Sequence, residues 1–256
     1  MIDKLAFVHP DAKIGNNVTI GPWSYIGAGV EIGDDTWISS HVVVKGPSII
    51  GKGNRIFQFA SVGEECQDLK YDGEPTRLIM GDNNVVRESV TIHRGTIQDN
   101  SETRIGSNNL FMAYVHIAHD CVVGNNVIMA NNASIAGHVH VGDSVILGGM
   151  TGVHQFVHIG AHAFTAGSST IFQDVPPFVM AAGSPAVPRG LNAEGLKRRG
   201  FSKATQHAIR RAYKALYRKN LTIDEAIAEM KQDAENDEHI QGMIDFVTGS
   251  SRGIIR

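Results

Sequence analysis

Aliphatic side chains recur at every sixth position along most of this chain, starting at Ile14. Written in sixes from there, the sequence reads IGNNVT, IGPWSY, IGAGVE, IGDDTW, ISSHVV, VKGPSI, IGKGNR, IFQFAS and VGEECQ. The pattern resumes at Met80 and again, shifted by one residue, at Ile105. A period of six fits neither an α-helix nor a strand that simply alternates. It predicts a solenoid in which each unit is a short strand plus a turn, and three units complete one coil.

In such a solenoid the recurring aliphatic residues point inward and stack in ladders, with successive coils about 4.8 Å apart. We expect the glycine or asparagine beside them to accept positive φ at the corners. The period persists over more than twenty units, which disfavours the alternative of a glycine-rich β-sandwich with accidental periodicity. Two polar segments, at about 68–79 and 98–104, interrupt the ladder, and we expect both to protrude as loops.

Toward the C-terminus the six-residue period gives way to helical patterns. Ser202 can cap one helix, and Thr222 with Glu225 forms a capping-box signature for a second. The apolar positions of these two helices and of a third are Ile209, Tyr213 and Leu216; Ile223, Ile227 and Met230; and Ile240, Met243, Ile244 and Val247. We therefore predict a solenoid over residues 1–190 and an α-helical bundle over 191–256. The bundle would cover the last coil, whose open edge would otherwise invite strand addition.

The composition excludes several classes of protein. The 256 residues carry 23 Lys and Arg against 26 Asp and Glu, a near-neutral balance that argues against nucleic-acid binding. No apolar run is long enough for a membrane span or a signal peptide, so we expect a cytoplasmic protein. The two cysteines, Cys66 and Cys121, form neither a disulfide framework nor a zinc-type pair.

Charge is divided sharply within the predicted bundle. Residues 189–219 contain ten Lys and Arg and one acid, whereas residues 222–240 contain seven acids and one Lys. Solvated helix faces would explain this division. A basic surface that binds an anionic partner would explain it equally well.

Twelve histidines are a high number for this length, and the coil brings several of them together. His119 and His138 are separated by one coil and one residue, and His154 lies on the following coil. A histidine with a neighbouring carboxylate, as His119 has in Asp120, can be held in one tautomer and act as a general base. Metal coordination is the rival interpretation. The four-residue spacing from His154 to His162, however, indicates a zinc site only on an α-helix.

Five stretches of the chain give it a more specific resemblance. They are QDLKY at 67–71, TIHRG at 91–95, HIAHDC at 116–121, VHQF at 153–156 and NAEGLKRRGF at 192–201. With these stretches the chain resembles, over its whole length, the acyl-carrier-protein–UDP-N-acetylglucosamine O-acyltransferases, a hexapeptide-repeat family of lipid A synthesis. The resemblance implies a left-handed parallel β-helix and a homotrimer with active sites between subunits.

The same resemblance implies a reaction and its catalytic residues. A 3-hydroxyacyl group would move from the phosphopantetheine thioester of acyl carrier protein to the 3-hydroxyl of UDP-N-acetylglucosamine, with no metal and no cofactor of the enzyme's own. His119 would be the general base and Asp120 would orient it. The backbone N–H of Gly137 would stabilise the oxyanion.

The resemblance also implies a set of substrate-binding residues. They are Gln67, Asp68, Lys70, His93, His116, His138, His154, Gln155, Gly167, Asn192, Glu194, Arg198 and Arg199. By this resemblance the loop residues Asp68 and Lys70 would contact the sugar and the nearby acyl chain. The residues that would engage the nucleotide are Asn192, Glu194, Arg198 and Arg199, with the two arginines facing the pyrophosphate. Gly167 ends the acyl groove and would leave it open to a longer chain. Ala166 departs from the paired glycines that many members have there.

Three other interpretations stand beside this one. A hexapeptide-repeat hydratase would use histidines of neighbouring coils to hold a metal. An acyltransferase of the same family could instead accept a 3-amino analogue of the sugar nucleotide. A non-catalytic β-helical scaffold would leave the histidine cluster and the basic tail without a purpose.

Overall fold

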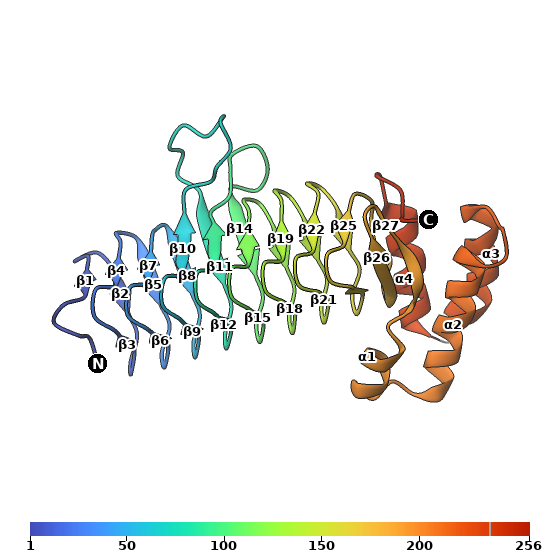
Figure 1. The fold of residues 1–256 in the computed structure, drawn as a ribbon, viewed down its shortest axis with the longest axis horizontal. Coiled ribbons are helices and arrows are strands. Elements are labelled where there is room, and N and C mark those ends of the chain that lie inside the picture. The colour runs from blue at the N-terminus through green and yellow to red at the C-terminus, as the bar shows by residue number, and fades with distance from the viewer. Residues whose placement is uncertain (236) are drawn as a thin grey trace.

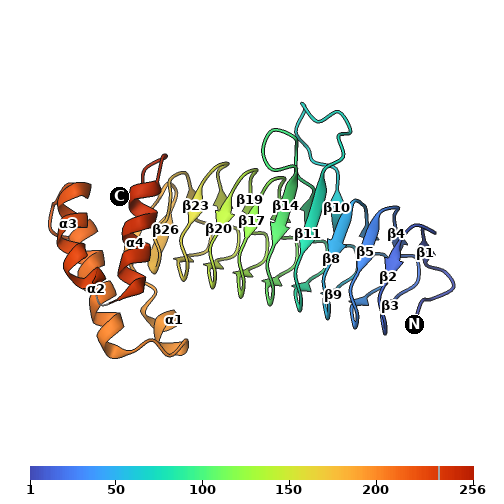
Figure 2. The same ribbon diagram turned by 180° about the vertical axis from the view of Figure 1, so that it is seen from behind.

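The computed structural model describes residues 1–235 and 237–256. Over most of this length the chain winds as an elongated solenoid, and a group of helices lies at its C-terminal end (Figures 1 and 2). Within the described residues the strands form three sheets, and every third strand along the chain belongs to the same sheet until the last coil. The pairing is parallel except between the last two strands, which are antiparallel. The repeat therefore forms the solenoid that the six-residue period predicted.

The three sheets are named here in the order in which the chain enters them. The first contains β1 (Phe7–Val8), β4 (Tyr25–Ile26), β7 (Val43–Val44), β10 (Ser61–Glu64), β13 (Thr91–His93), β16 (His116–Ile117), β19 (Ser134–Ile135), β22 (Gly152–Val153) and β25 (Thr170–Ile171). The second contains β2 (Lys13–Ile14), β5 (Val30–Ile32), β8 (Ser48–Ile50), β11 (Arg77–Met80), β14 (Glu102–Ile105), β17 (Val122–Val123), β20 (His140–Val141) and β23 (His158–Ile159). The third contains β3 (Thr19–Ile20), β6 (Trp37–Ile38), β9 (Arg55–Ile56), β12 (Val85–Val86), β15 (Leu110–Phe111), β18 (Ile128–Met129), β21 (Ile146–Leu147), β24 (Phe164–Thr165), β26 (Val179–Gly183) and β27 (Ala186–Leu191).

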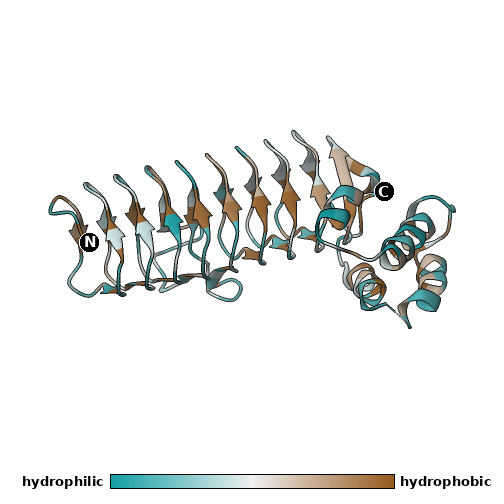
Figure 3. Cartoon of the chain, turned by 90° about the horizontal axis from the view of Figure 1, so that it is seen from below, coloured by the Kyte–Doolittle hydropathy of each residue, from teal (hydrophilic) through white to brown (hydrophobic). Residues whose placement is uncertain are grey.

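The predicted aliphatic ladders form the core. In the first sheet Ile92, Ile117 and Ile135 occupy matching positions on successive coils, and each is fully buried. Figure 3 shows brown strands along much of the solenoid, with some white or teal strands in its N-terminal half, and largely teal chain between the strands. We name the three edges of the solenoid by the sheets that they join: first-to-second, second-to-third and third-to-first.

The glycine that follows a ladder residue has a different role from the one expected. A Cβ on Gly15 would lie 2.6 Å from Asp34 Oδ1, and a Cβ on Gly33 would lie 2.6 Å from the carbonyl carbon of Gly51. Neither glycine has a positive φ. The positive φ falls two residues later, as at Asn17 with 55°. The expectation of positive φ at these glycines was therefore wrong: they are required because neighbouring coils approach too closely for a side chain.

Two loops protrude from the same side of the solenoid (Figure 1). The first runs from 65 to 76, between β10 and β11, and the second from 94 to 101, between β13 and β14. Residues 77–79 and 102–104, which the interrupted pattern placed in the loops, are strand residues. They pair in parallel at three positions, and the fourth pair of the two strands is Met80 with Ile105, where the six-residue pattern resumes.

The helical part contains α1 (Ala193–Arg198), α2 (Lys203–Tyr217), α3 (Ile223–Ala234) and α4 (Glu238–Gly249). Ser202 caps α2, and Thr222 with Glu225 forms the predicted capping box of α3. The apolar positions predicted for α2 and α4 are buried, whereas the short helix α1 was not predicted. In the described residues, none of the helices has the length and apolarity needed to cross a membrane.

Candidate active site

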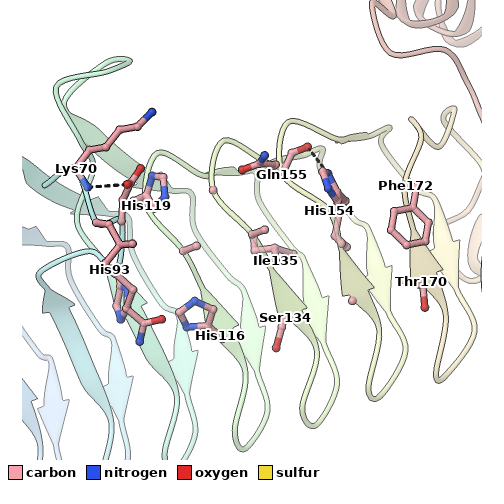
Figure 4. A pocket seen from close by; sticks show the side chains of 18 residues that line it. Lys70, His93, His116, His119, Ser134, Ile135, His154, Gln155, Thr170 and Phe172 are labelled. Atoms are coloured by element: carbon pink, nitrogen blue, oxygen red, sulfur yellow. Dashed lines mark hydrogen bonds between the residues drawn. The ribbon is translucent and has the colours of Figure 1, made fainter.

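A pocket of about 830 Å³ lies on the outer face of the first sheet, next to the first-to-second edge and beneath the first loop (Figure 4). Strands β13, β16, β19, β22 and β25 supply its floor, so that side chains from successive coils line it in a row. Residues 67–70 of the first loop close one end. The predicted site residues that line it are Gln67, Asp68, Lys70, His93, His116, His119, Gly137, His154 and Gln155.

Two histidines of the floor are held as neutral side chains. The rings of His93 and His116 meet edge to face with centroids 4.9 Å apart, and His116 Nδ1 lies 2.7 Å from the hydroxyl of Thr91. Burial, together with the neighbouring His116, lowers the pKa of His93 to about 4. Burial, with His119 nearby, also lowers the pKa of His116. At neutral pH these imidazoles therefore offer hydrogen bonds to a polar substrate without adding charge.

His119 and Asp120 form a hydrogen-bonded pair at the pocket wall. His119 Nδ1 lies 2.8 Å from Asp120 Oδ2, and the Asp120 side chain is completely buried. Burial alone would raise the pKa of Asp120, but hydrogen bonds from His119 and Thr96 outweigh it and hold this pKa below its usual value. Asp120 is therefore an ionised acceptor, and Nδ1 of His119 carries the proton. His119 Nε2 is left with a free lone pair, as a general base requires.

Gly137 lies directly against the His119 ring. A Cβ at this position would fall 2.5 Å from His119 Cε1 and 2.6 Å from Nε2, so no other residue fits without moving the ring. In the described part of the chain, the Gly137 N–H has no hydrogen-bond partner. A backbone donor is thus available next to the His119 ring, and its role toward an oxyanion stays a prediction.

The second loop supplies two residues that sequence reasoning missed. The Thr96 hydroxyl donates to Asp120 Oδ2 at 2.6 Å, and its N–H lies 2.9 Å from Oδ1. Asp99 Oδ2 lies 3.1 Å from Nδ1 of His138. His138 is largely buried, stacks on Phe156 at 4.4 Å and meets the His119 ring at 5.1 Å. The predicted proximity of His119 and His138 is therefore confirmed, but His138 lies behind the pocket wall.

The C-terminal segment reaches back to the opposite end of the pocket. Arg252 donates from Nη1 to the Gln155 carbonyl oxygen at 2.9 Å and from Nε to the Phe172 carbonyl oxygen at 2.9 Å. Its Nη2 lies 3.1 Å from Nδ1 of His154, which also lies 3.1 Å from the Gln155 carbonyl oxygen. Nδ1 of His154 thus lies between a donor, the Arg252 guanidinium, and an acceptor, the Gln155 carbonyl oxygen, and Arg252 fixes this end of the pocket through all three groups. Arg252 was also missed, because no local pattern pairs it with His154.

The remaining predicted residues lie away from this pocket. Asn192 caps α1 and donates to the His162 carbonyl oxygen at the second-to-third edge. Arg199 bonds Ser144 at the same edge, at 2.5 Å. Exposed Glu194 and Arg198 pair with each other on α1 at 3.1 Å, and Gly167 lies at the third-to-first edge. One chain therefore does not bring the predicted nucleotide-binding residues to the predicted base.

The cluster of His119, Asp120 and His138 also bears on the metal interpretation. Each of the three offers a ligand atom within 4.8 Å of the others. The atoms that would converge are, however, already hydrogen-bonded, because Asp120 Oδ2 accepts from both His119 and Thr96. The arrangement suits an oriented base better than an open set of metal ligands.

A solenoid of six-residue repeats, with a histidine–carboxylate pair at the wall of a large pocket, defines a hexapeptide-repeat transferase. A family model described as bacterial transferase hexapeptide (six repeats) matches residues 102–137, and one described as GMPPB C-terminal domain matches residues 1–105. A third model, described as Udp N-acetylglucosamine O-acyltransferase, domain 2, matches residues 174–255. Together the three models span both the solenoid and the helical part.

Full-length relatives then identify the family. The chain is 58% identical over 255 residues to a Saccharophagus degradans protein named acyl-[acyl-carrier-protein]–UDP-N-acetylglucosamine O-acyltransferase, covering 100% of this chain and 99% of that protein. It superposes with a TM-score of 0.97 on LpxA from Acinetobacter baumannii, at 50% identity, covering 100% of this chain and 99% of that one. The UDP-N-acetylglucosamine acyltransferase of Francisella novicida gives a TM-score of 0.97 at 43% identity, with 100% and 94% covered.

The chain belongs to the acyl-[acyl-carrier-protein]–UDP-N-acetylglucosamine O-acyltransferase family. It is therefore an enzyme, and its solenoid is the left-handed parallel β-helix of these relatives, as the resemblance implied. The hydratase and scaffold interpretations are not favoured by this membership.

Proposed function

We propose that this enzyme transfers a 3-hydroxyacyl group from acyl carrier protein to the 3-hydroxyl of UDP-N-acetylglucosamine, the first step of lipid A synthesis. The observation that carries the proposal is the His119–Asp120 pair at the wall of the pocket. It supplies the base that a sugar hydroxyl needs, since a hydroxyl attacks a thioester efficiently only as its proton is removed.

In the proposed mechanism Nε2 of His119 takes the proton from the sugar hydroxyl while its oxygen attacks the thioester carbonyl. The buried Asp120 carboxylate stabilises the resulting imidazolium. The negative charge that develops on the carbonyl oxygen is stabilised by the Gly137 N–H. Collapse of the tetrahedral intermediate breaks the carbon–sulfur bond, and the imidazolium returns its proton to the leaving thiolate. The chemistry needs no metal and no cofactor beyond the carrier's phosphopantetheine.

The pocket residues support an assignment of the sugar nucleotide to this site. Asp68 and Lys70 enter from the first loop, and we assign them contacts to the sugar and the start of the acyl chain. The remaining proposed contacts within the pocket are Gln67, His93, His116, His154 and Gln155, with His138 behind the wall. Asn192, Glu194, Arg198 and Arg199 would bind the nucleotide.

The separation of these groups supports a homotrimer with sites between subunits. The proposed nucleotide-binding residues lie toward the second-to-third edge of one chain, whereas the pocket lies at its first-to-second edge. One substrate can touch both sets only if they come from different copies. Exposed apolar side chains at the third-to-first edge, between 60% and 64% accessible, also suit coverage by a neighbour; they are Trp23, Phe59, Tyr114 and Met150.

Acyl carrier protein is acidic, so we assign its docking to the basic segment 189–219. Two of the basic side chains there bond acids of α3: Arg211 pairs with Asp233, and Lys219 pairs with Glu229. The charge division of the tail is thus partly an intramolecular pairing of α2, and of Lys219 just after it, with α3. Apart from Arg198 and Arg199, which we assign to the nucleotide, the other basic side chains of the segment remain for the carrier. We expect the KM for the carrier to rise several-fold from low to high salt. A KM that is independent of salt would exclude this surface.

Incubation with a 3-hydroxyacyl carrier protein and UDP-N-acetylglucosamine tests the proposal. We expect a 3-O-acylated sugar nucleotide, formed equally well with and without a chelator. The 3-amino analogue should be the poorer acceptor when the two compete. Preferential acylation of the analogue would identify it as the true acceptor, and loss of activity with the chelator would revive the metal-dependent alternative. In fractionated cells we expect the enzyme in the cytoplasm.

A further inference from the structure

Two residues of the sequence motifs have no part in the proposed chemistry. Arg94 follows the pocket residue His93 on the chain, and Tyr71 follows Lys70 in the first loop. The Arg94 side chain is only 7% exposed although it carries a charge. Its Nη1 donates to the carbonyl oxygen of Gly46 at 2.6 Å, and its Nη2 donates to the hydroxyl of Tyr71 at 3.1 Å. The guanidinium therefore bridges the solenoid and the loop.

The solenoid is shaped to receive this guanidinium where the first loop begins. At Gly63 the pairing of β10 with β13 is interrupted by a bulge, and Gly63 has a φ of 75°. A Cβ on Gly63 would lie 2.2 Å from the hydroxyl of Ser48, so only glycine fits. The Gly63 carbonyl oxygen accepts from Arg94 Nη1 at 3.2 Å. The bulge thus both starts the loop and supplies an acceptor to Arg94.

Charge pairing does not account for the burial of Arg94. Its carboxylate partner is Glu65, at 3.7 Å from Nη2, and the Glu65 side chain is 60% exposed. A buried cation held mainly by neutral acceptors is costly to maintain. Its guanidinium is instead held on the solenoid by the carbonyl oxygens of Gly46 and Gly63, and it reaches the first loop through the Tyr71 hydroxyl. This arrangement indicates that Arg94 serves to connect the two.

On the loop side, Tyr71 closes the turn that brings Asp68 and Lys70 to the pocket. The Tyr71 N–H donates to the Asp68 carbonyl oxygen at 3.0 Å, and the Lys70 N–H donates to Asp68 Oδ1 at 2.9 Å. The Tyr71 hydroxyl donates to the Glu74 carbonyl oxygen at 3.1 Å while it accepts from Arg94. One hydroxyl therefore joins the turn, the returning half of the loop and the solenoid.

We propose that Arg94 is a positioning residue that acts through Tyr71 to fix Asp68 and Lys70 over the pocket. The inference rests on the proposed function for its kinetic consequence, because these two residues are there assigned contacts to the sugar. Its structural consequence is independent of the substrate. We call the hydrogen bond between Arg94 and Tyr71 the clamp. Because Arg94 directly follows His93, which lines the pocket floor, the clamp fixes the position of the loop relative to that floor.

Hydrogen exchange of the intact protein tests the structural consequence. Tyr71→Phe removes only the hydroxyl, and Arg94→Lys keeps the charge but loses the two-sided donor geometry. Loss of one hydrogen bond to a charged group should speed exchange of the amides of 67–74 by about ten- to hundredfold. Tyr25→Phe, the same change on an early coil, should leave them unaltered. Unaltered exchange in Tyr71→Phe would overturn the clamp.

Kinetics test the consequence for the substrate. In Tyr71→Phe we expect the KM for UDP-N-acetylglucosamine to rise about tenfold while kcat changes less than about threefold, because the His119–Asp120 pair is not touched. Adding Arg94→Lys to Tyr71→Phe should cause no further rise in this KM, since both changes break the same hydrogen bond between Arg94 and Tyr71. A loosened loop with an unaltered KM would overturn the positioning role. Wild-type enzyme that acylates no sugar nucleotide would instead refute the proposed function, and the exchange result would then decide the clamp alone.

Discussion

One coil before the first loop and two coils after it have the same left-handed corner at the first-to-second edge but present different side chains there. In an early coil the left-handed corner position of that edge is Gly29, with a φ of 68°. In the later coils the same position holds Asp120 and His138, with φ values of 57° and 62°. Because the backbone is the same, the chemistry of the later coils depends on which side chain the corner carries.

The outer face of the first sheet differs in the same way. In the early coils Phe7 and Tyr25 stack face to face with ring centroids 5.1 Å apart. In the later coils the corresponding positions are His116 and Ser134, which lie side by side in register at the floor of the pocket. A repeat scaffold thus separates folding from function: the inward residues pack the core and are mostly apolar, whereas the outward ones are free to change.

The largest expected effect is loss of the base. His119→Ala should keep the fold, because the side chain lies at the pocket wall and outside the ladders, and should lower turnover by about 10²–10⁴-fold. His9→Ala, on the same edge of an early coil, should retain turnover within about twofold. Steady-state kinetics of the two variants and the wild type measure these changes in turnover. Near-normal turnover in His119→Ala would remove His119 from the mechanism.

The next largest effect concerns acyl length. Gly167 does not have a positive φ; the positive φ of this corner belongs to the neighbouring Ser168. A Cβ added to Gly167 would lie 3.3 Å from the Gly149 carbonyl oxygen. Gly167→Met should therefore be tolerated while it blocks about four methylenes of a long chain. At about 0.8 kcal/mol for each, this is a loss of roughly a hundredfold on long donors only. Activity with a series of acyl donors of increasing length measures this loss. An equal loss of activity on all lengths would refute the idea that position 167 limits the length of the acyl chain.

A smaller effect is expected from the second loop. Thr96→Val removes the hydroxyl that donates to Asp120 while the backbone donor stays. Loss of a hydrogen bond to a charged group should lower kcat by about tenfold and raise the apparent pKa of the acidic limb of the pH–rate profile. Thr96→Ser should restore both. An unaltered profile in the valine variant would show that Thr96 does not act through Asp120.

Sequence periodicity predicted the parts of the site that lie on the coils. The six-residue register placed His119 beside His138, and their rings meet at 5.1 Å. The register could not place Thr96 or Asp99, because both lie in the second loop, where the six-residue repeat does not determine the path of the chain. The position of Arg252 was equally hidden, since it depends on how the helices pack on the last coil. A strong repeat predicts which residues of successive coils are neighbours. The positions of loops and of docked helices depend on tertiary contacts, which the repeat does not contain.

The smallest predicted effect concerns stability at the helix-covered end. Burial, with Arg199 and His239 nearby, lowers the pKa of His162 to about 4. Between about pH 6.5 and pH 4 the unfolded chain therefore binds a proton that the folded chain does not, so stability falls as the pH falls. His162→Asn, which tolerates the φ of 60° at this corner, should recover about 1 kcal/mol of that loss. Thermal unfolding at pH 7 and pH 5 measures it, and equal pH slopes would contradict the assignment.

The most direct test of the central claim is the turnover of Asp120→Asn. Asparagine also tolerates the left-handed corner, so the coil should be preserved, but its amide cannot hold the proton on Nδ1 of His119 or stabilise the imidazolium. We expect kcat to fall by about 10²–10⁴-fold with little change in the KM for UDP-N-acetylglucosamine, as the proposed roles of His119 and Asp120 require. A correctly folded Asp120→Asn enzyme with kcat within about threefold of the wild type would contradict these roles.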